Sequence, residues 1–246
     1  MVKSAVKNNL NEHLLEFRQR FIKSLIFFLF FFIIGYIFSE QIYNFLLKPL
    51  EINSEDSRRI IYTSPIEAFL SYLKLSFIFA LFCSLPLILW QIYLFLTPAL
   101  YKKERGIMIM IFLISPILFF VGSALCYYGL LPIALKFFLS FENINSVIPI
   151  ILEAKISEYL KLILNMIFIF GLIFQIPLLF LLLIKFKKID KISLKKFRKY
   201  YIILSFTIGA IFTPPDIFSQ IFIAVIMILF YEIMVFFTKD QSPKDS

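Results

Sequence analysis

Residues Ile107–Leu131 read IMIMIFLISPILFFVGSALCYYGLL and contain no charged side chain. A helix needs about 20 predominantly apolar residues to cross the hydrocarbon core of a bilayer, with about 17–25 as the working range. The stretch has that length. Pro116 is tolerated inside a membrane helix, where we expect it to produce a kink. The segment therefore predicts a transmembrane helix and, with it, an all-α membrane protein.

Similar apolar stretches lie on both sides of this segment. The first follows a basic lead-in, as in a signal peptide, but no small residues suited to cleavage follow it, so we expect it to remain as a span. Pro86 and Pro177 fall inside two further spans and should kink them. We predict one integral membrane domain over residues 1–246 with six spans, at about 21–38, 66–96, 107–131, 159–184, 200–212 and 217–237.

The composition agrees with a polytopic membrane protein. Of the 246 residues, 61% are hydrophobic and the mean hydropathy is +0.89, whereas soluble domains are about 45–50% apolar. A single core of this size cannot bury that much apolar surface. Charged residues make up only 17% and there are two cysteines, which argues against a disordered chain or a disulfide scaffold.

The basic residues predict the orientation of the chain. If the N-terminus is inside, 18 of the 25 lysines and arginines lie in inner segments and five in outer loops, while Lys74 and Lys161 lie inside spans. Because inner loops carry the excess of lysine and arginine, both termini are predicted to be cytoplasmic. The net charge of +9 is explained by this asymmetry, and we predict no nucleic-acid partner.

The last two predicted spans form a short hairpin. They are separated by Thr213-Pro214-Pro215-Asp216, because two prolines and an aspartate end a helix. Residues 200–212 would span about 20 Å as a helix, against a hydrocarbon core of about 30 Å. We expect the hairpin either to thin the bilayer or to dock against the rest of the protein.

Few residues in the sequence could carry catalysis. His13 is the only histidine, and Cys83 and Cys126 lie in different predicted spans, where each is expected to be a small packing residue. The six glycines form no nucleotide-binding pattern. We therefore predict a protein that is not an enzyme and has neither a metal site nor a cofactor.

The N-terminal segment predicts an amphipathic helix that leads into the first span. Asn9 followed by Glu12 resembles a capping box, and an apolar stripe at helical spacing follows it. Glu16 lies four residues before Arg20, so a local ion pair worth a few tenths of a kcal/mol is one interpretation of this carboxylate.

Seven stretches of the sequence stand out as motifs: His13–Phe21, Thr63–Phe69, Ser84–Pro86, Gln91–Phe95, Pro98–Arg105, Phe174–Pro177 and Thr213–Gln220. Together they resemble the TatC family, the multispanning core of the twin-arginine protein translocase. The resemblance covers about residues 12–237, and the Thr-Pro-Pro-Asp and Leu-Tyr-x-x-Glu-Arg blocks are its most specific parts. It implies export of folded cargo driven by the proton-motive force.

This resemblance implies a binding patch for signal peptides that carry two consecutive arginines. Guanidinium groups pair best with carboxylates, and the resemblance assigns this role to Glu16 and to Glu104 in the first inner loop. Glu104 is surrounded by basic residues, so local neutralisation is the alternative interpretation. Arg18 and Phe95 also match the family's patch, although an interfacial aromatic anchor would equally explain Phe95.

Other residues match the family without belonging to this patch. Gln175 is an intramembrane polar residue at which many members carry Glu, so the chain departs from the family there; pairing between helices is the alternative. The resemblance makes Thr213 and Gln220 candidates for contact with TatA- or TatB-type single-span subunits, with turn capping and pairing inside the bundle as alternatives. Structural or functional motif residues are Pro49 in an outer loop, Pro86, Pro214, Pro215 and Asp216.

The resemblance further implies an oligomer in the bacterial inner membrane or in an organelle membrane of bacterial origin. The main competing class is a secondary transporter or channel for a small solute, because kinked helices and buried polar groups also mark substrate paths. Against it, the charges within the spans lie near their ends, and the two halves show no convincing internal repeat. A membrane scaffold is a third class, but a scaffold would not need acidic residues on the inner face.

Overall fold

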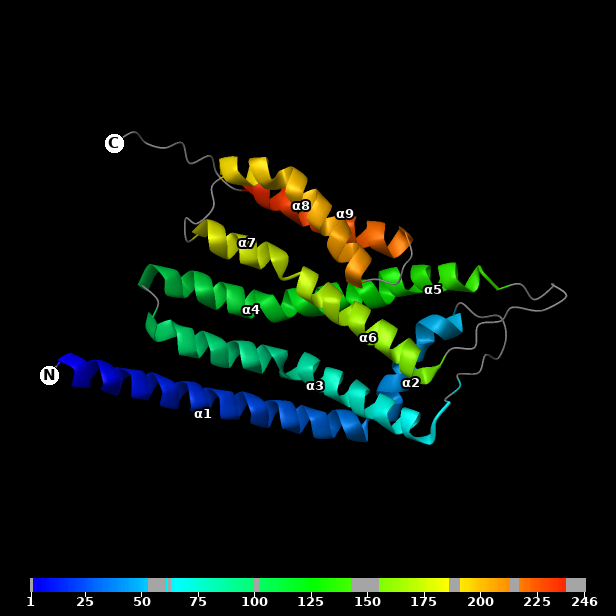
Figure 1. The fold of residues 1–246 in the computed structure, drawn as a ribbon, viewed down its shortest axis with the longest axis horizontal. Helices are drawn as coiled ribbons and strands as arrows, with labels where there is room; N and C mark the ends of the chain where they lie inside the picture. The colour runs from blue at the N-terminus through cyan, green and yellow to red at the C-terminus, as the bar shows by residue number, and fades with distance from the viewer. Residues whose placement is uncertain are drawn as a thin grey trace. The chain divides into compact units, whose positions relative to one another are not determined.

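The computed structural model describes residues 2–52, 61, 63–99, 102–142, 155–185, 191–212 and 217–237. These residues are almost entirely helical (Figure 1). A short 3₁₀ turn covers Thr97–Ala99, and a π-helical segment, Cys126–Leu130, joins two α-helices. The α-helices are α1 Val2–Ile37, α2 Ser39–Ile52, α3 Pro65–Leu96, α4 Lys102–Leu125, α5 Leu131–Leu139, α6 Ile156–Ile173, α7 Ile176–Lys185, α8 Lys191–Phe212 and α9 Ile217–Phe237.

The prediction of an all-helical, polytopic membrane protein is confirmed. Within the described residues, five stretches are long and apolar enough to cross a membrane: His13–Ile37, Pro65–Leu96, Arg105–Leu139, Ile156–Ile184 and Ile217–Phe236. They correspond to predicted spans one to four and six. The predicted fifth span, 200–212, forms the apolar second half of α8, whose first half is rich in lysine and arginine.

Two local predictions in the N-terminal quarter are wrong. The capping box is not formed, because α1 begins at Val2 and Asn9 lies inside it; the preceding residues include no glycine or proline that would stop the helix. Pro49 was expected in a loop but lies inside α2. Helix α2 has apolar residues at helical spacing, with Leu46 and Leu50 both buried, which is the pattern of an amphipathic helix.

The three prolines inside the spans differ in their effect. At Pro177, where a kink was expected, the helix is interrupted, because α6 ends at Ile173 and α7 begins at Ile176. A proline has no amide hydrogen to continue the ladder, and the backbone N–H of Gln175 instead bonds the carbonyl of Leu172. Helices α3 and α4 run on past Pro86 and Pro116, so bends at those two positions remain predictions.

The helices form two compact units, and the first consists of Met1–Phe45 and Ser64–Ile117. In this unit α1 and α3 lie side by side (Figure 1). Phe17 contacts Phe95 and Phe28 contacts Phe77, with ring centroids 5.7 and 5.2 Å apart, so the two helices are antiparallel. This pairing places the N-terminal part of α1 beside the end of α3.

The second unit consists of Leu46–Thr63 and Leu118–Ser246. Its core contains a reciprocal packing of glycine against phenylalanine between α4 and α6. A Cβ atom on Gly171 would lie 2.5 Å from Cε2 of Phe119, and one on Gly122 would lie 2.6 Å from the ring of Phe174. Small residues allow membrane helices to approach this closely. The hydroxyl of Ser123 donates a 3.2 Å hydrogen bond to the carbonyl of Ile167 across the same contact.

Helices α8 and α9 form an antiparallel hairpin in the second unit (Figure 1). At its basic end, Arg198 forms an ion pair with Glu232 at 2.5 Å, and the Tyr231 hydroxyl donates to the carbonyl of Leu194. The rings of Tyr201 and Tyr231 stack with centroids 4.2 Å apart. The hairpin is therefore closed by polar and aromatic contacts near the end opposite to its turn.

Candidate functional site

Glu16 and Arg20 form the best-defined charged contact of the N-terminal helix. The Arg20 guanidinium donates from Nη2 at 2.5 Å and from Nε at 3.1 Å, and both bonds end on Oε1 of Glu16. The local ion pair considered from the sequence is therefore present. Both side chains remain partly exposed, 22% for Arg20 and 31% for Glu16. The carboxylate thus holds a guanidinium at a position that a ligand could still reach.

Two other predicted site residues lie close to this pair. Arg18 is exposed on α1, two residues after Glu16. Phe95, near the end of α3, packs edge-to-face on Phe17, which follows Glu16 directly. This contact fixes the end of α3 beside the turn of α1 that carries the carboxylate. The structure therefore places Phe95 beside the turn of α1 that carries Glu16 and Arg18, and the role of these residues in binding a signal peptide stays a prediction.

Glu104 and the turn of the last hairpin can be placed only in part. The backbone of Glu104 lies in the first turn of α4, but its side chain is outside the described residues. Thr213, Pro214, Pro215 and Asp216 also lie outside them. The roles predicted for these residues therefore stay predictions.

The polar residues predicted inside the membrane have structural contacts in the second unit. Gln175 lies at the break between α6 and α7, where its carbonyl accepts the N–H of Leu179 at 3.1 Å. The Nε2 of Gln220 donates to the carbonyl of Phe206 at 3.2 Å, which is the pairing inside the bundle considered as the alternative. Pro49, also in this unit, is buried.

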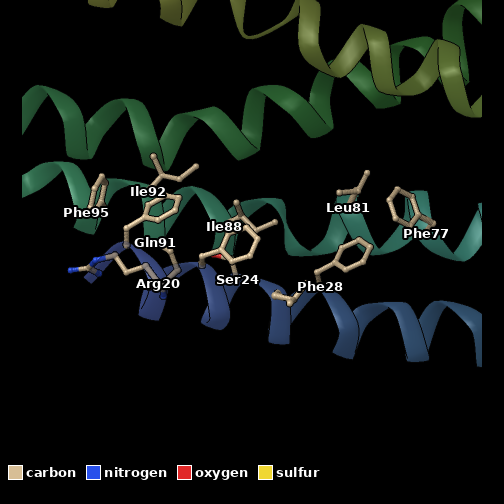
Figure 2. A pocket seen from close by; sticks show the side chains of 12 residues that line it. Arg20, Ser24, Phe28, Phe77, Leu81, Ile88, Gln91, Ile92 and Phe95 are labelled. Atoms are coloured by element: carbon tan, nitrogen blue, oxygen red, sulfur yellow. The ribbon is translucent and has the colours of Figure 1, made fainter. Parts of the chain in front are cut away.

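Sequence reasoning missed a groove between α1 and α3. The groove has a volume of about 440 Å³, and its walls are apolar except for Arg20, Ser24 and Gln91. Figure 2 shows Arg20, Gln91, Ile92 and Phe95 at one end of it and Phe28 and Phe77 at the other. No motif indicated this groove, because its lining residues resemble ordinary lipid-facing side chains in the sequence.

No cluster of three or more histidine, cysteine, aspartate or glutamate side chains occurs among the described residues. The fold and the apolar helices define a polytopic helical membrane protein. Residues 12–225 match the model of one family, described as "Sec-independent protein translocase protein (TatC)". The chain belongs to the TatC family.

Individual relatives agree with this family. The chain is 44% identical over 222 residues to the Sec-independent protein translocase protein TatC of Rickettsia prowazekii (strain Madrid E), a match that covers 90% of this chain and 88% of the relative. It is 31% identical to the TatC protein of Escherichia coli (strain K12), over 92% of this chain and 86% of the relative. A tatC-like protein of Reclinomonas americana, ymf16, is 38% identical over 92% of this chain and 86% of that relative.

A solved structure shares the fold as well. The crystal structure of the twin arginine translocase receptor TatC in DDM superposes with a TM-score of 0.77 at 33% sequence identity. The match covers 92% of this chain and 99% of that chain. Membership of this family removes the small-solute transporter and the scaffold as competing function classes.

Proposed function

We propose that this chain is the core membrane subunit and signal-peptide receptor of a twin-arginine translocase, and that Glu16 binds one arginine of the signal peptide. The family match, together with the solved relative described as a twin arginine translocase receptor, supports the receptor role. In this role the protein binds and releases a peptide and catalyses no covalent step.

The observation that carries the proposal for Glu16 is its bond with Arg20. An arginine side chain already sits on this carboxylate, with two donors on one oxygen, so the geometry suits a guanidinium ligand. Charge-assisted hydrogen bonds of this kind contribute about 1.5–3 kcal/mol, whereas an exposed i,i+4 ion pair is worth only about 0.3–0.5 kcal/mol. A signal-peptide arginine with additional contacts can therefore displace Arg20.

The surroundings of Glu16 give the neighbouring residues their proposed roles. Phe95 packs on Phe17 and holds the site against α3, so it acts as a positioning residue. Glu104 is the proposed acceptor for the second arginine, because two guanidinium groups need two carboxylates. Arg18 adds positive charge, so a cationic peptide has to be selected by specific bonds rather than by the local field.

The proposed topology has six spans with both termini on the inner side. The 18-to-5 distribution of basic residues supports this orientation, since positive residues accumulate in inner loops. The sixth span is obtained by counting the apolar part of α8, residues 200–212, which is too short to cross an undistorted bilayer. The hairpin of α8 and α9 would then thin the bilayer locally.

The hairpin is the proposed contact for TatA- and TatB-type single-span subunits in a hetero-oligomer. Polar groups near the tip, Thr213 and Gln220, would bond a polar residue of a neighbouring helix. Interhelical hydrogen bonds in membranes are worth about 0.6–2 kcal/mol, so this contact would be reversible. Gln220 would have to exchange its bond to Phe206 for one with the partner. In the second unit, Gln175 at the break between α6 and α7 is the proposed functional polar residue within the membrane.

Equilibrium binding of a fluorescent twin-arginine signal peptide to the purified full chain tests the receptor proposal. Glu16→Gln keeps the size of the side chain and removes its charge, so binding should weaken by about 1–3 kcal/mol. Glu158→Gln is the matched control, because Glu158 lies at the start of α6 with only a 4.0 Å contact to Lys155. Equal binding by the wild-type chain and Glu16→Gln would refute the role of Glu16.

A further inference from the structure

The groove between α1 and α3 has the dimensions and polarity of an amphiphile-binding site. Its α1 wall runs from Phe17 to Phe28, which corresponds to about 17 Å of helix. Along this length the walls are aromatic and aliphatic, and the large side chains remain accessible: Phe21 is 58% exposed and Phe77 is 47% exposed. In a bilayer these side chains would contact lipid tails.

The polar residues of the groove are not spread evenly. Arg20 and Gln91 lie at the end beside Phe95, and Figure 2 shows the Arg20 guanidinium pointing away from the apolar row. Ser24 lies one turn further along α1 from Arg20, and the far end at Phe28 and Phe77 is apolar (Figure 2). The groove is therefore polar at the proposed inner interface and apolar towards the membrane centre.

At the end of the groove beside Phe95, one side-chain oxygen lacks a hydrogen-bond donor among the described residues. Gln91 Oε1 is buried and has no hydrogen-bond partner among the described residues. A buried acceptor without a donor costs about 1–3 kcal/mol, so a rotation of the Gln91 amide that turns this oxygen into the groove would let a ligand hydroxyl stabilise it. The ligand suited to this end has both an anionic group for the guanidinium and a hydroxyl donor.

The local charge favours an anionic ligand over a cationic peptide. Arg18 and Arg20 outweigh Glu16 on this part of α1. Basic pockets between membrane helices on the cytoplasmic side are suited to anionic lipid headgroups, and each arginine or lysine near an anionic surface contributes about 1 kcal/mol. The groove and the proposed arginine-binding site at the Glu16 carboxylate are therefore two different sites, although Arg20 contributes to both.

We infer that this groove binds one anionic glycerophospholipid of the phosphatidylglycerol type. One acyl chain lies along the apolar wall of α1 and α3, the phosphate pairs with Arg20, and a headgroup hydroxyl donates to Gln91. The lipid thereby fills the space between the two helices next to Glu16. This lipid site does not depend on the proposed binding of a signal-peptide arginine, because it uses the apolar groove and the Arg20 guanidinium rather than the Glu16 carboxylate.

Native mass spectrometry of the purified full chain tests this site, with phosphatidylglycerol and phosphatidylcholine of identical acyl chains as probes. We expect one retained phosphatidylglycerol and weaker binding of phosphatidylcholine. Arg20→Gln should weaken phosphatidylglycerol binding roughly fivefold, the equivalent of about 1 kcal/mol. Lys23→Gln is the matched control, because it removes a charge from the same helix without lining the groove.

A second pair of variants separates groove binding from surface binding. Ser24→Trp fills the middle of the groove and should abolish retention of the lipid, while Ile33→Trp, at an exposed position on α1 outside the groove, should leave it unchanged. Ile92→Trp provides a second filled variant if Ser24→Trp does not fold, as judged by circular dichroism.

Two results would overturn the inference. The first is equal retention of the two lipids, or phosphatidylglycerol retention that survives both filled variants. The second is displacement of the lipid, one for one, by the apolar segment of a signal peptide with no arginines, since the groove would then be a peptide site. Loss of twin-arginine peptide binding in Glu16→Gln with lipid retention intact would separate the two sites.

Discussion

Both hydrogen bonds of the Arg20 guanidinium end on the same oxygen of Glu16, Oε1, at 2.5 and 3.1 Å. The protein thus presents its proposed arginine acceptor already occupied by one of its own arginines. Arg20 is only four residues from Glu16, so the pair forms within one turn of α1 and is weak at this degree of exposure. An incoming arginine must compete with it.

Removing this competitor should strengthen signal-peptide binding. Arg20→Gln frees Glu16 and also removes a like charge facing the peptide, so we expect the dissociation constant of a twin-arginine peptide to fall about two- to fivefold. Fluorescence anisotropy on the purified chain measures this change. Lys23→Gln removes the same charge without freeing Glu16 and should have a smaller effect; unchanged or weaker binding in Arg20→Gln would contradict competition.

The second carboxylate should contribute independently of the first. Glu104→Gln is expected to weaken twin-arginine peptide binding by about 1–3 kcal/mol and to slow export of a twin-arginine reporter while leaving other export routes unaffected. Reporter export in cells and peptide binding in vitro check the two effects. Normal export by Glu104→Ala cells would remove this residue from the binding patch.

The sequence predicted the apolar helices better than the polar ones. Helix α9 coincides with the predicted span 217–237, and α3 begins only one residue before its prediction, because Pro65 and the apolar run define both ends. Helix α2 was missed because it is short and amphipathic, and hydropathy alone does not distinguish such a helix from a loop. The early start of α1 was missed because Asn9 looked like a cap.

The site was predictable only where a motif marked it. Glu16 and Phe95 stand in family motifs, and their proximity follows from the antiparallel pairing of α1 and α3. Pairing of Gln220 inside the bundle was one of two interpretations, because an amide in a membrane helix needs a partner, but the sequence did not identify the carbonyl of Phe206 as that partner. That the Oε1 of Gln91 has no partner within the described part of the chain depends on the detailed packing of two helices, which no sequence pattern encodes.

The reciprocal glycine contacts should be important for stability. Gly171→Ala places a methyl group within 2.5 Å of the buried ring of Phe119, so α4 and α6 have to separate. Overpacking of this kind typically costs about 1–3 kcal/mol. Gly106→Ala is the matched control, since a Cβ there meets nothing within 4 Å and alanine favours the helix. Thermal unfolding in detergent should show a lower Tm for Gly171→Ala only.

Gln220 tests whether the hairpin tip serves the fold or a partner. Gln220→Leu removes the bond to the Phe206 carbonyl, and we expect reduced crosslinking of a TatA- or TatB-type subunit to α8 with signal-peptide binding intact. The stability loss should stay within about 0.6–2 kcal/mol. If protein level and peptide binding fall together, Gln220 supports the fold and the partner role is withdrawn.

Cysteine accessibility tests the proposed topology. Cys83 and Cys126 are first replaced by alanine, and single cysteines are then placed at Ser4, Ser193 and Ser242 for the inner side and at Ser54 and Ser146 for the outer side. A membrane-impermeant maleimide applied to intact cells should label only the last two. Labelling at Ser193 from outside would contradict the six-span arrangement.

A double-mutant cycle between the protein and the signal peptide tests the central claim most directly. Binding is measured for the wild-type chain and Glu16→Gln, each with a twin-arginine peptide and with peptides in which one arginine or the other is replaced by glutamine. A direct bond between Glu16 and an arginine predicts a coupling energy of about 1.5–3 kcal/mol for one of the two arginines. Additive effects for both arginines, with no coupling, would show that Glu16 does not bind the signal peptide's arginines.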